Sequence, residues 1–169
     1  SSKSKALFYK AEIYYGANLY EESLPIYKES FLVSKKSKLK RNILEGMMAS
    51  LSKIDKKNNA YLDYGSFAFE NYLVSEPSLD KKRDIYPLLF KIYLSSNNIA
   101  GAGKLLTGFN RTYSKMSKTI ESMLANLLDH PQIRNDKNLF LKWVQRINSK
   151  EFRVSKKMAH SIKVNALNI

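Results

Sequence analysis

The chain has 169 residues and a formal net charge of +14 at pH 7, from 29 Lys and Arg against 15 Asp and Glu. Its six Gly and four Pro are fewer than the turns of an all-β fold require, and its apolar content of 44% excludes a disordered chain. No cysteine is present, so disulfides, thiolate nucleophiles and thiolate metal ligands are excluded. The composition therefore favours an all-α fold.

Apolar residues recur at helical spacing along almost the whole chain, and no stretch keeps a period of two. The pattern predicts four antiparallel helix pairs followed by one capping helix, all joined by short connections, within a single domain over residues 1–169. The expected pairs cover about residues 5–34, 38–74, 79–115 and 117–147, and the expected capping helix covers residues 150–166.

Two connections give more detail about helix ends. Ser78 follows Pro77 and is expected to cap a helix over residues 79–95, and Ser149 is expected to cap the last helix from residue 150. His130 and Pro131 are expected to form a break between the two helices of the fourth pair.

The first pair carries a distinct motif, Leu7-x2-Lys10-Ala11-x2-Tyr14 followed by Tyr20, Ser23-x3-Tyr27 and Ser30. Its small residues allow two helices to approach closely, and its aromatic rings fill the space around them. The spacing resembles that of the tetratricopeptide repeat (TPR) family. A looser match, Tyr86-x2-Leu89-Phe90-x2-Tyr93, occurs in the third pair, and the second keeps Gly46, Ala49 and Ala60.

The resemblance covers about residues 6–116 and implies a TPR-like α-solenoid, a right-handed superhelix of antiparallel helix pairs. In that family the first helix of each pair lines a concave groove that holds a segment of a partner protein. Carried over pair by pair, the resemblance implies that the groove is lined by Lys5, Phe8, Glu12, Tyr15, Lys40, Ile43, Met47, Lys91 and Leu94. This mixture suits an acidic or amphipathic helix of the partner.

The positive charge is unevenly distributed, because residues 1–34 contain four Lys and four Glu and the excess lies in residues 35–169. Basic clusters occur at the connections between pairs, which share one edge in a solenoid. The predicted basic edge consists of Lys35, Lys36, Lys38, Arg41, Lys81, Lys82 and Arg83. It suits an acidic partner, an anionic membrane surface or nucleic acid. The alternative is that these are ordinary solvated charges near loops.

Catalytic motifs are weak throughout the chain. Gly101-Ala102-Gly103-Lys104 resembles half of a phosphate-binding loop, but Asn98 and Leu105 stand where Gly and Ser or Thr are required, so we interpret these small residues as a helix contact. His130 and His160 are expected to cap a helix or lie on the surface. We therefore expect no enzyme, catalytic residue, metal site or cofactor.

These observations predict a non-catalytic protein-interaction module, a scaffold or adaptor. The alternative is a basic helical-repeat domain that binds nucleic acid or an anionic membrane. No apolar run reaches the roughly 18 residues of a membrane span, and the compartment stays open between cytoplasm and periplasm. We expect the chain to be a fragment of a longer protein. A composition rich in Lys, Asn, Ser, Ile and Tyr suggests a bacterial origin, for which assembly of an envelope, secretion or motility complex is one hypothesis.

Overall fold

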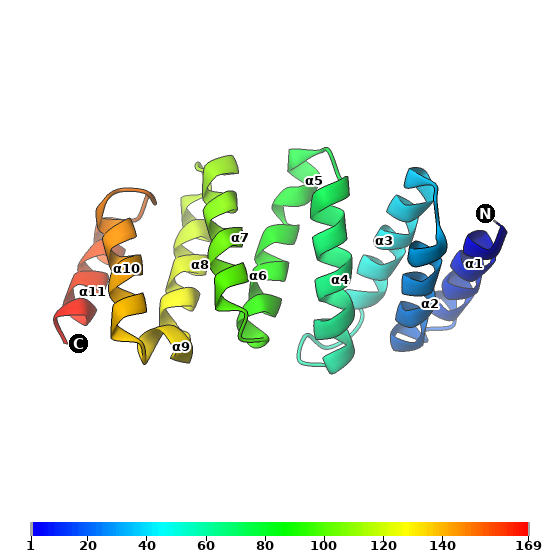
Figure 1. Cartoon of the computed structure of the whole chain (residues 1–169), viewed down its shortest axis with the longest axis horizontal. Helices are drawn as coiled ribbons and strands as arrows, with labels where there is room; N and C mark the ends of the chain where they lie inside the picture. The colour runs from blue at the N-terminus through cyan, green and yellow to red at the C-terminus, as the bar shows by residue number, and fades with distance from the viewer. Residues whose placement is uncertain (1, 169) are drawn as a thin grey trace. The chain divides into compact units, whose positions relative to one another are not determined.

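The structure is a computed structural model that describes residues 2–168, and within that range it consists of helices without strands (Figure 1). The prediction of an all-α fold is confirmed. The helices are α1 (Ser2–Gly16), α2 (Tyr20–Val33), α3 (Ser37–Leu51), α4 (Asn59–Ser75), α5 (Leu79–Arg83), α6 (Ile85–Ser95), α7 (Ile99–Thr112), α8 (Ser117–Asp129), α9 (Pro131–Arg134), α10 (Lys137–Asn148) and α11 (Lys156–Leu167).

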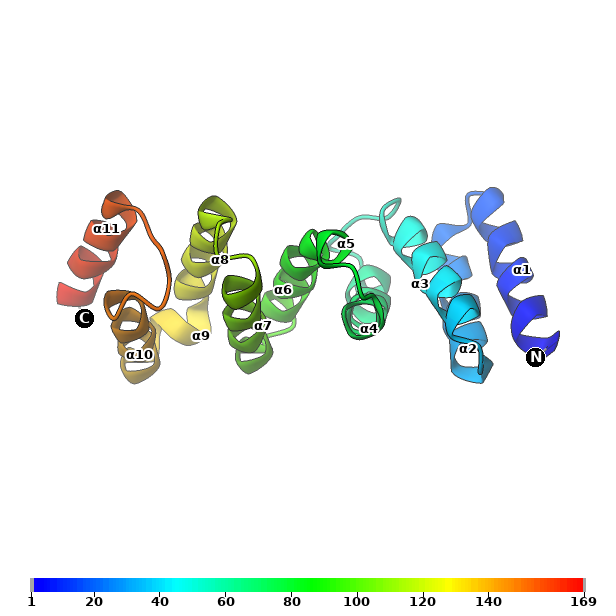
Figure 2. The same cartoon turned by 90° about the horizontal axis from the view of Figure 1, so that it is seen from above.

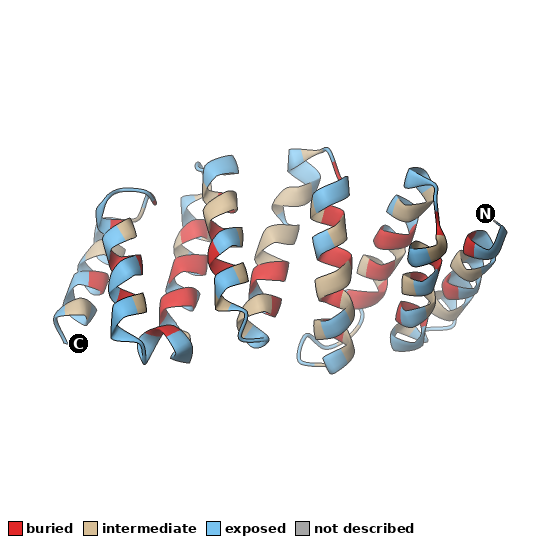
Figure 3. Ribbon diagram, viewed as in Figure 1, coloured by how far each residue is buried: buried red, intermediate tan, exposed pale blue. Residues whose placement is uncertain are grey.

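The helices belong to two compact units, Ser1–Ile92 (unit 1) and Tyr93–Ile169 (unit 2), and the boundary falls inside α6. In each unit the buried side chains lie mainly on helix faces that are turned toward neighbouring helices (Figure 3). This distribution follows from the 3.6-residue period of the apolar side chains. The expectation of one domain over residues 1–169 stays a prediction.

Small side chains set the spacing of the first helices in unit 1. Helices α1 to α4 pack antiparallel in consecutive order, and α1 also contacts α3 while α2 contacts α4 (Figures 1 and 2). The Ser4 hydroxyl donates to the Ser30 carbonyl at 2.9 Å, and the Ser23 and Ser50 hydroxyls lie 2.8 Å apart. Ala11, Ser23 and Ser30 are all fully buried, as the first-pair motif predicts.

Tyr27 of α2 joins three helices. Its ring packs so closely on α3 that a Cβ added at Gly46 would lie 2.6 Å from Tyr27 Cε1. Its hydroxyl donates to Glu12 Oε1 of α1 at 2.5 Å. Burial is the main cause that raises the pKa of Tyr27 above its ordinary value, and the hydrogen bond and negative charge of Glu12 act in the same direction. Tyr27 is therefore a neutral donor in the core of unit 1.

The helix expected over residues 79–95 is divided in two at Asp84. The Ser78 hydroxyl accepts from the Lys81 amide, which confirms the predicted N-cap of α5. Pro87 has no amide hydrogen to donate to the Arg83 carbonyl four residues earlier, and its ring crowds that carbonyl. The chain therefore ends α5 at Arg83 and begins α6 at Ile85.

Unit 2 depends on a close approach of α7 and α10. A Cβ added at Gly103 of α7 would lie 2.8 Å from Trp143 Cζ2, so the indole occupies the space that the missing side chain leaves free. Gly103 lies inside a continuous helix that ends at Thr112, a little before the expected residue 115. The interpretation of the Gly101–Lys104 motif as a helix contact is confirmed at Gly103.

The last helix begins at Lys156, so the prediction of a helix from residue 150 is wrong over residues 150–155. Lys150 has a left-handed backbone with φ 62°, which ends the helical path after α10. Phe152 is buried with its ring centroid 6.2 Å from that of Trp143. The N-cap of α11 is Ser155, whose hydroxyl accepts from the Met158 amide, and not Ser149.

The break expected at His130 contains the short helix α9. His130 is its N-cap, and its Nδ1 accepts from the Gln132 amide at 3.2 Å. Its Nε2 lies 3.0 Å from the Leu94 carbonyl, so this nitrogen carries the proton and donates. The predicted capping role of His130 is confirmed.

Candidate partner-binding surfaces

The first predicted groove segment lies on one face of α1. Lys5 and Glu12 are exposed, while Phe8 and Tyr15 are half-buried. The Phe8 ring centroid lies 6.2 Å from that of Tyr27, and Glu12 holds the Tyr27 hydroxyl. The spacing of these four α1 residues places them along one side of the helix. The α1 face therefore combines aromatic surface with charges of both signs.

The predicted groove residues of α3 are placed differently. Ile43 and Met47 have no exposed surface, so neither side chain is available to a partner, contrary to the prediction for these two positions. The reason is that α3 packs against both α2 and α4 and must bury two sides, while Glu45 stays exposed. Lys40 is half-buried, with its Nζ 4.9 Å from the Phe31 ring centroid.

The remaining predicted groove residues lie on α6, which the unit boundary divides. Lys91 belongs to unit 1 and is exposed, and Leu94 belongs to unit 2 and is half-buried. The carbonyl of Leu94 is occupied by His130. Of the predicted groove, the structure brings the α1 residues together on one helix face.

The predicted basic edge lies wholly in unit 1. Its two clusters are at the connection between α2 and α3 and on α5, and both are at the same end of unit 1, at the top of Figure 1. This follows from the antiparallel order, because α2 and α4 run toward the same end. Arg41 lies close enough to Tyr72 of α4 for its charge to oppose the rise in the pKa of Tyr72 that burial causes.

The charges of the basic edge are mostly uncompensated. Arg83 lies 3.6 Å from Asp80 and 3.6 Å from Asp84, measured between the nearest nitrogen and oxygen atoms. The other six cations form no ion pair with any residue that the structure describes: Lys35, Lys36, Lys38, Arg41, Lys81 and Lys82. This end of unit 1 is therefore strongly positive.

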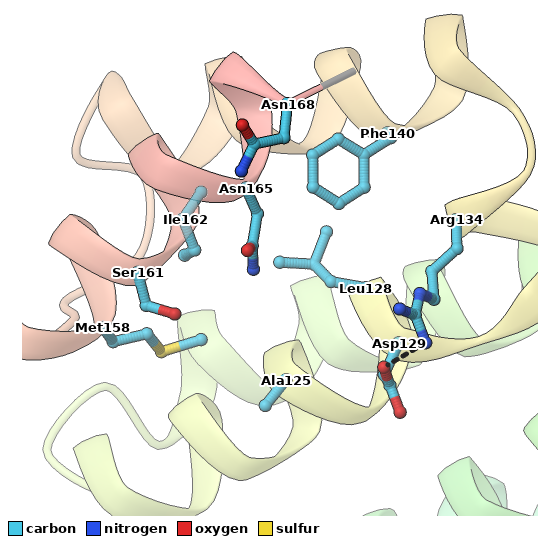
Figure 4. Close-up of a pocket in the computed structure, with 10 residues that line it drawn as sticks. All are labelled: Ala125, Leu128, Asp129, Arg134, Phe140, Met158, Ser161, Ile162, Asn165 and Asn168. Carbon is cyan, nitrogen blue, oxygen red and sulfur yellow. Dashed lines mark hydrogen bonds and ion pairs between the residues drawn. The ribbon is translucent and has the colours of Figure 1, made fainter.

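A pocket of about 390 Å³ lies among α8, α9, α10 and α11 in unit 2 (Figure 4). Its apolar floor is made by Leu128, Phe140 and Ile162, which are buried, and Ala125 and Met158 form its wall. The polar part of its lining consists of Ser161 and Asn165 on α11, Asn168 just after α11, and Asp129 with Arg134, whose side chains are joined at 3.1 Å.

The lining of this pocket combines apolar side chains with groups that can form hydrogen bonds. The apolar floor can take an apolar side chain, and each Asn amide both donates and accepts, as a peptide backbone does. Among the described residues that line it, only Asp129 and Arg134 are ionisable, and they pair with each other.

Arg146 of α10 holds the segment between α10 and α11 in place. Its guanidinium donates to both carboxylate oxygens of Glu151 and, at 2.9 Å, to Thr107 Oγ1 of α7. It also stacks on Trp143, with Cζ 4.3 Å from the ring centroid, and on Phe152. The hydrogen bond and charge of Arg146 lower the pKa of Glu151, so this carboxylate is ionised at neutral pH.

Other kinds of site find little support in the described part of the chain. Residues 2–168 contain no group of three or more His, Asp or Glu that could hold a metal ion. No helix in this range has the length and apolar character needed to cross a bilayer. His160 is exposed on α11, as expected.

The pocket of Figure 4 was not predicted from the sequence. Its residues come from four helices, and the path from α8 through α9 to α10 decides how Leu128 and Phe140 meet. The one signal in the sequence is the apolar stripe of the last helix, which includes Ile162. That stripe predicts burial against a neighbouring helix, but it does not predict a gap beside it.

No family model, no curated protein sequence and no solved structure matches this chain.

Proposed function

We propose that this chain is a non-catalytic protein-interaction module, a scaffold or adaptor that holds a segment of another protein. The observation that carries the proposal is the pocket of Figure 4, which combines a buried apolar floor with amide side chains at its rim. An apolar side chain of the partner enters the floor, while Asn165 and Asn168 hydrogen-bond its backbone. The α1 face, with Phe8 and Tyr15 half-exposed, is a further contact surface in unit 1.

We also propose that the helices form a TPR-like α-solenoid, with α11 as the capping helix. Two observations support this. From α1 to α4 each helix contacts the next one, and α1 also contacts α3 while α2 also contacts α4, as in stacked repeats. The small residues of the first-pair motif are buried at helix contacts. A repeat architecture of this kind favours binding of an extended partner segment.

The proposal is tested by capturing partners from native lysate on the immobilised chain, with nuclease present, and comparing two variants. Ala125→Arg places a long charged side chain at the pocket, and Asn126→Arg adds the same charge on the same helix outside it. Both positions are exposed, so both variants are expected to fold, which circular dichroism checks. Ala125→Arg is expected to reduce the retained partner about tenfold and Asn126→Arg to leave it unchanged. Equal retention by both variants contradicts the proposed pocket.

A second candidate function is binding of nucleic acid or an anionic membrane by the basic edge. The specific observation is the group of six cations at one end of unit 1 that form no ion pair with any described residue. Such a surface attracts phosphate groups, and the affinity of this binding falls strongly as the salt concentration rises. If nuclease abolishes capture and the two α8 variants behave alike, this candidate replaces the first.

A further inference from the structure

A second concavity, about 580 Å³, lies between α7 and α10 in unit 2 and shares no lining residue with the pocket of Figure 4. We call it the α7–α10 groove. Its floor is made partly by Ala100, Gly103 and Gly108 on one side of α7, and Leu139 and Trp143 line it from α10. A Cβ added at Gly108 would meet no atom within 4 Å. The backbone or a small side chain of a partner can therefore approach α7 closely.

The charge of this groove has one sign. Lys104, Arg111 and Arg146 line it, and no Asp or Glu is among the described lining residues. Arg146 is compensated by Glu151, whose pKa is also lowered by the charge of Arg111. Lys104 and Arg111 are exposed and form no ion pair with any described residue. An apolar floor is thus flanked by two cations that form no ion pair with the residues described.

The spacing of Lys104 and Arg111 restricts which arrangement of partner carboxylates can neutralise both. Lys104 and Arg111 are two helical turns apart on α7, which separates their backbones by about 10 Å along the helix. Carboxylates seven residues apart on a partner helix have the same separation. Small apolar residues between them would lie over Gly108, where an added Cβ meets no atom within 4 Å, whereas Gly103 is already covered by Trp143.

We propose that the α7–α10 groove binds an acidic helical segment of a partner protein, with carboxylates on Lys104 and Arg111 and small apolar side chains on the floor. A second copy of this chain is disfavoured by the net charge of +14, which opposes self-association. Nucleic acid is disfavoured because Trp143 is buried and stacked by Arg146, so its ring face is not free to stack on a base. The site is separate from the pocket of Figure 4 and does not depend on it.

The test uses labelled helical peptides on a constant framework of Ala and Leu, without Trp, that carry Glu or Gln at two positions seven residues apart. Binding is followed by anisotropy and by the emission of Trp143, the only tryptophan of the chain, which lines the groove. The Glu peptide is expected to bind and to change this emission, and the Gln peptide to bind about tenfold more weakly. The double variant Lys104→Glu with Arg111→Glu is expected to lower the affinity for the Glu peptide by a similar factor.

The matched control is Lys137→Glu with Lys163→Glu, which makes the same change of charge in unit 2 at exposed positions outside the groove. It is expected to change affinity less than about threefold. Three results would overturn the proposal. The two double variants could weaken binding of the Glu peptide equally, the Glu and Gln peptides could bind equally well, or neither peptide could bind. An oligonucleotide or an anionic vesicle that displaces the peptide and itself depends on Lys104 and Arg111 would also overturn it. Ala125→Arg is expected to leave peptide binding unchanged, so failure here is distinguishable from failure of the proposed pocket.

Discussion

Gly103→Leu is expected to lower the free energy of unfolding of unit 2 by about 3 kcal/mol. A Cβ at this position alone would lie 2.8 Å from Trp143 Cζ2 and 3.4 Å from Cη2, and a Leu adds further carbons in the same direction. The indole cannot yield easily, because Arg146 stacks on it and Phe152 packs beside it. Urea unfolding followed by Trp143 emission reports on unit 2 directly, since Trp143 is the only tryptophan.

Gly108→Leu is the matched control on the same helix. A Cβ there meets nothing within 4 Å, and Leu has the better helix propensity, so this variant is expected to gain about 0.5–1 kcal/mol. The opposite signs separate packing against Trp143 from a general intolerance of α7 to larger side chains. A similar loss at both positions would contradict the packing described for Gly103.

Alkaline pH is expected to destabilise the protein steeply above about pH 10, where unfolded tyrosines ionise. Burial raises the pKa values of Tyr27, Tyr61 and Tyr72 in the folded chain. Their stabilising contribution is therefore fully present below the unfolded pKa and is lost as the pH rises toward the folded values. Each tyrosine lowers the free energy of unfolding by up to about 1.4 kcal/mol per pH unit, so the three together lower it by up to about 4 kcal/mol per pH unit. Urea midpoints measured across this range give the slope.

Tyr27→Phe isolates one of these contributions. It removes the hydroxyl that donates to Glu12, so it is expected to cost about 1–2 kcal/mol at neutral pH and to reduce the alkaline slope by about one third. Tyr9→Phe serves as the control, because Tyr9 is 62% exposed. Deprotonation of lysines affects both variants alike. If stability fell with alkaline pH equally steeply in Tyr27→Phe and in the wild type, Tyr27 would not be the buried, neutral donor described above.

The sequence predicts the local features of this fold well. Helical periodicity and the small residues Ala11, Ser23 and Ser30 correctly indicate antiparallel helices in close contact, because a helix buries one face at a fixed period. Ser78 and His130 are correctly predicted as caps, since capping depends on a few neighbouring residues.

Features that depend on distant contacts could not be predicted in the same way. The segment before α11 is not helical, because Phe152 packs against Trp143 and Glu151 pairs with Arg146. No sequence pattern near residue 150 predicts these contacts. The burial of Ile43 on α3 depends likewise on how α2 and α4 pack around that helix. The pocket of Figure 4 and the α7–α10 groove each depend on how the helices of unit 2 pack together.

If the pocket of Figure 4 holds a segment of another protein, site-specific photocrosslinking from the pocket captures that segment. A photoreactive phenylalanine analogue replaces Ala125 at the pocket or Asn126 beside it, and each protein is irradiated in native lysate treated with nuclease. We expect a discrete protein adduct from position 125, identified by mass spectrometry, and none of comparable yield from position 126. Equal adducts from both positions, or no protein adduct from position 125, would contradict the proposed pocket.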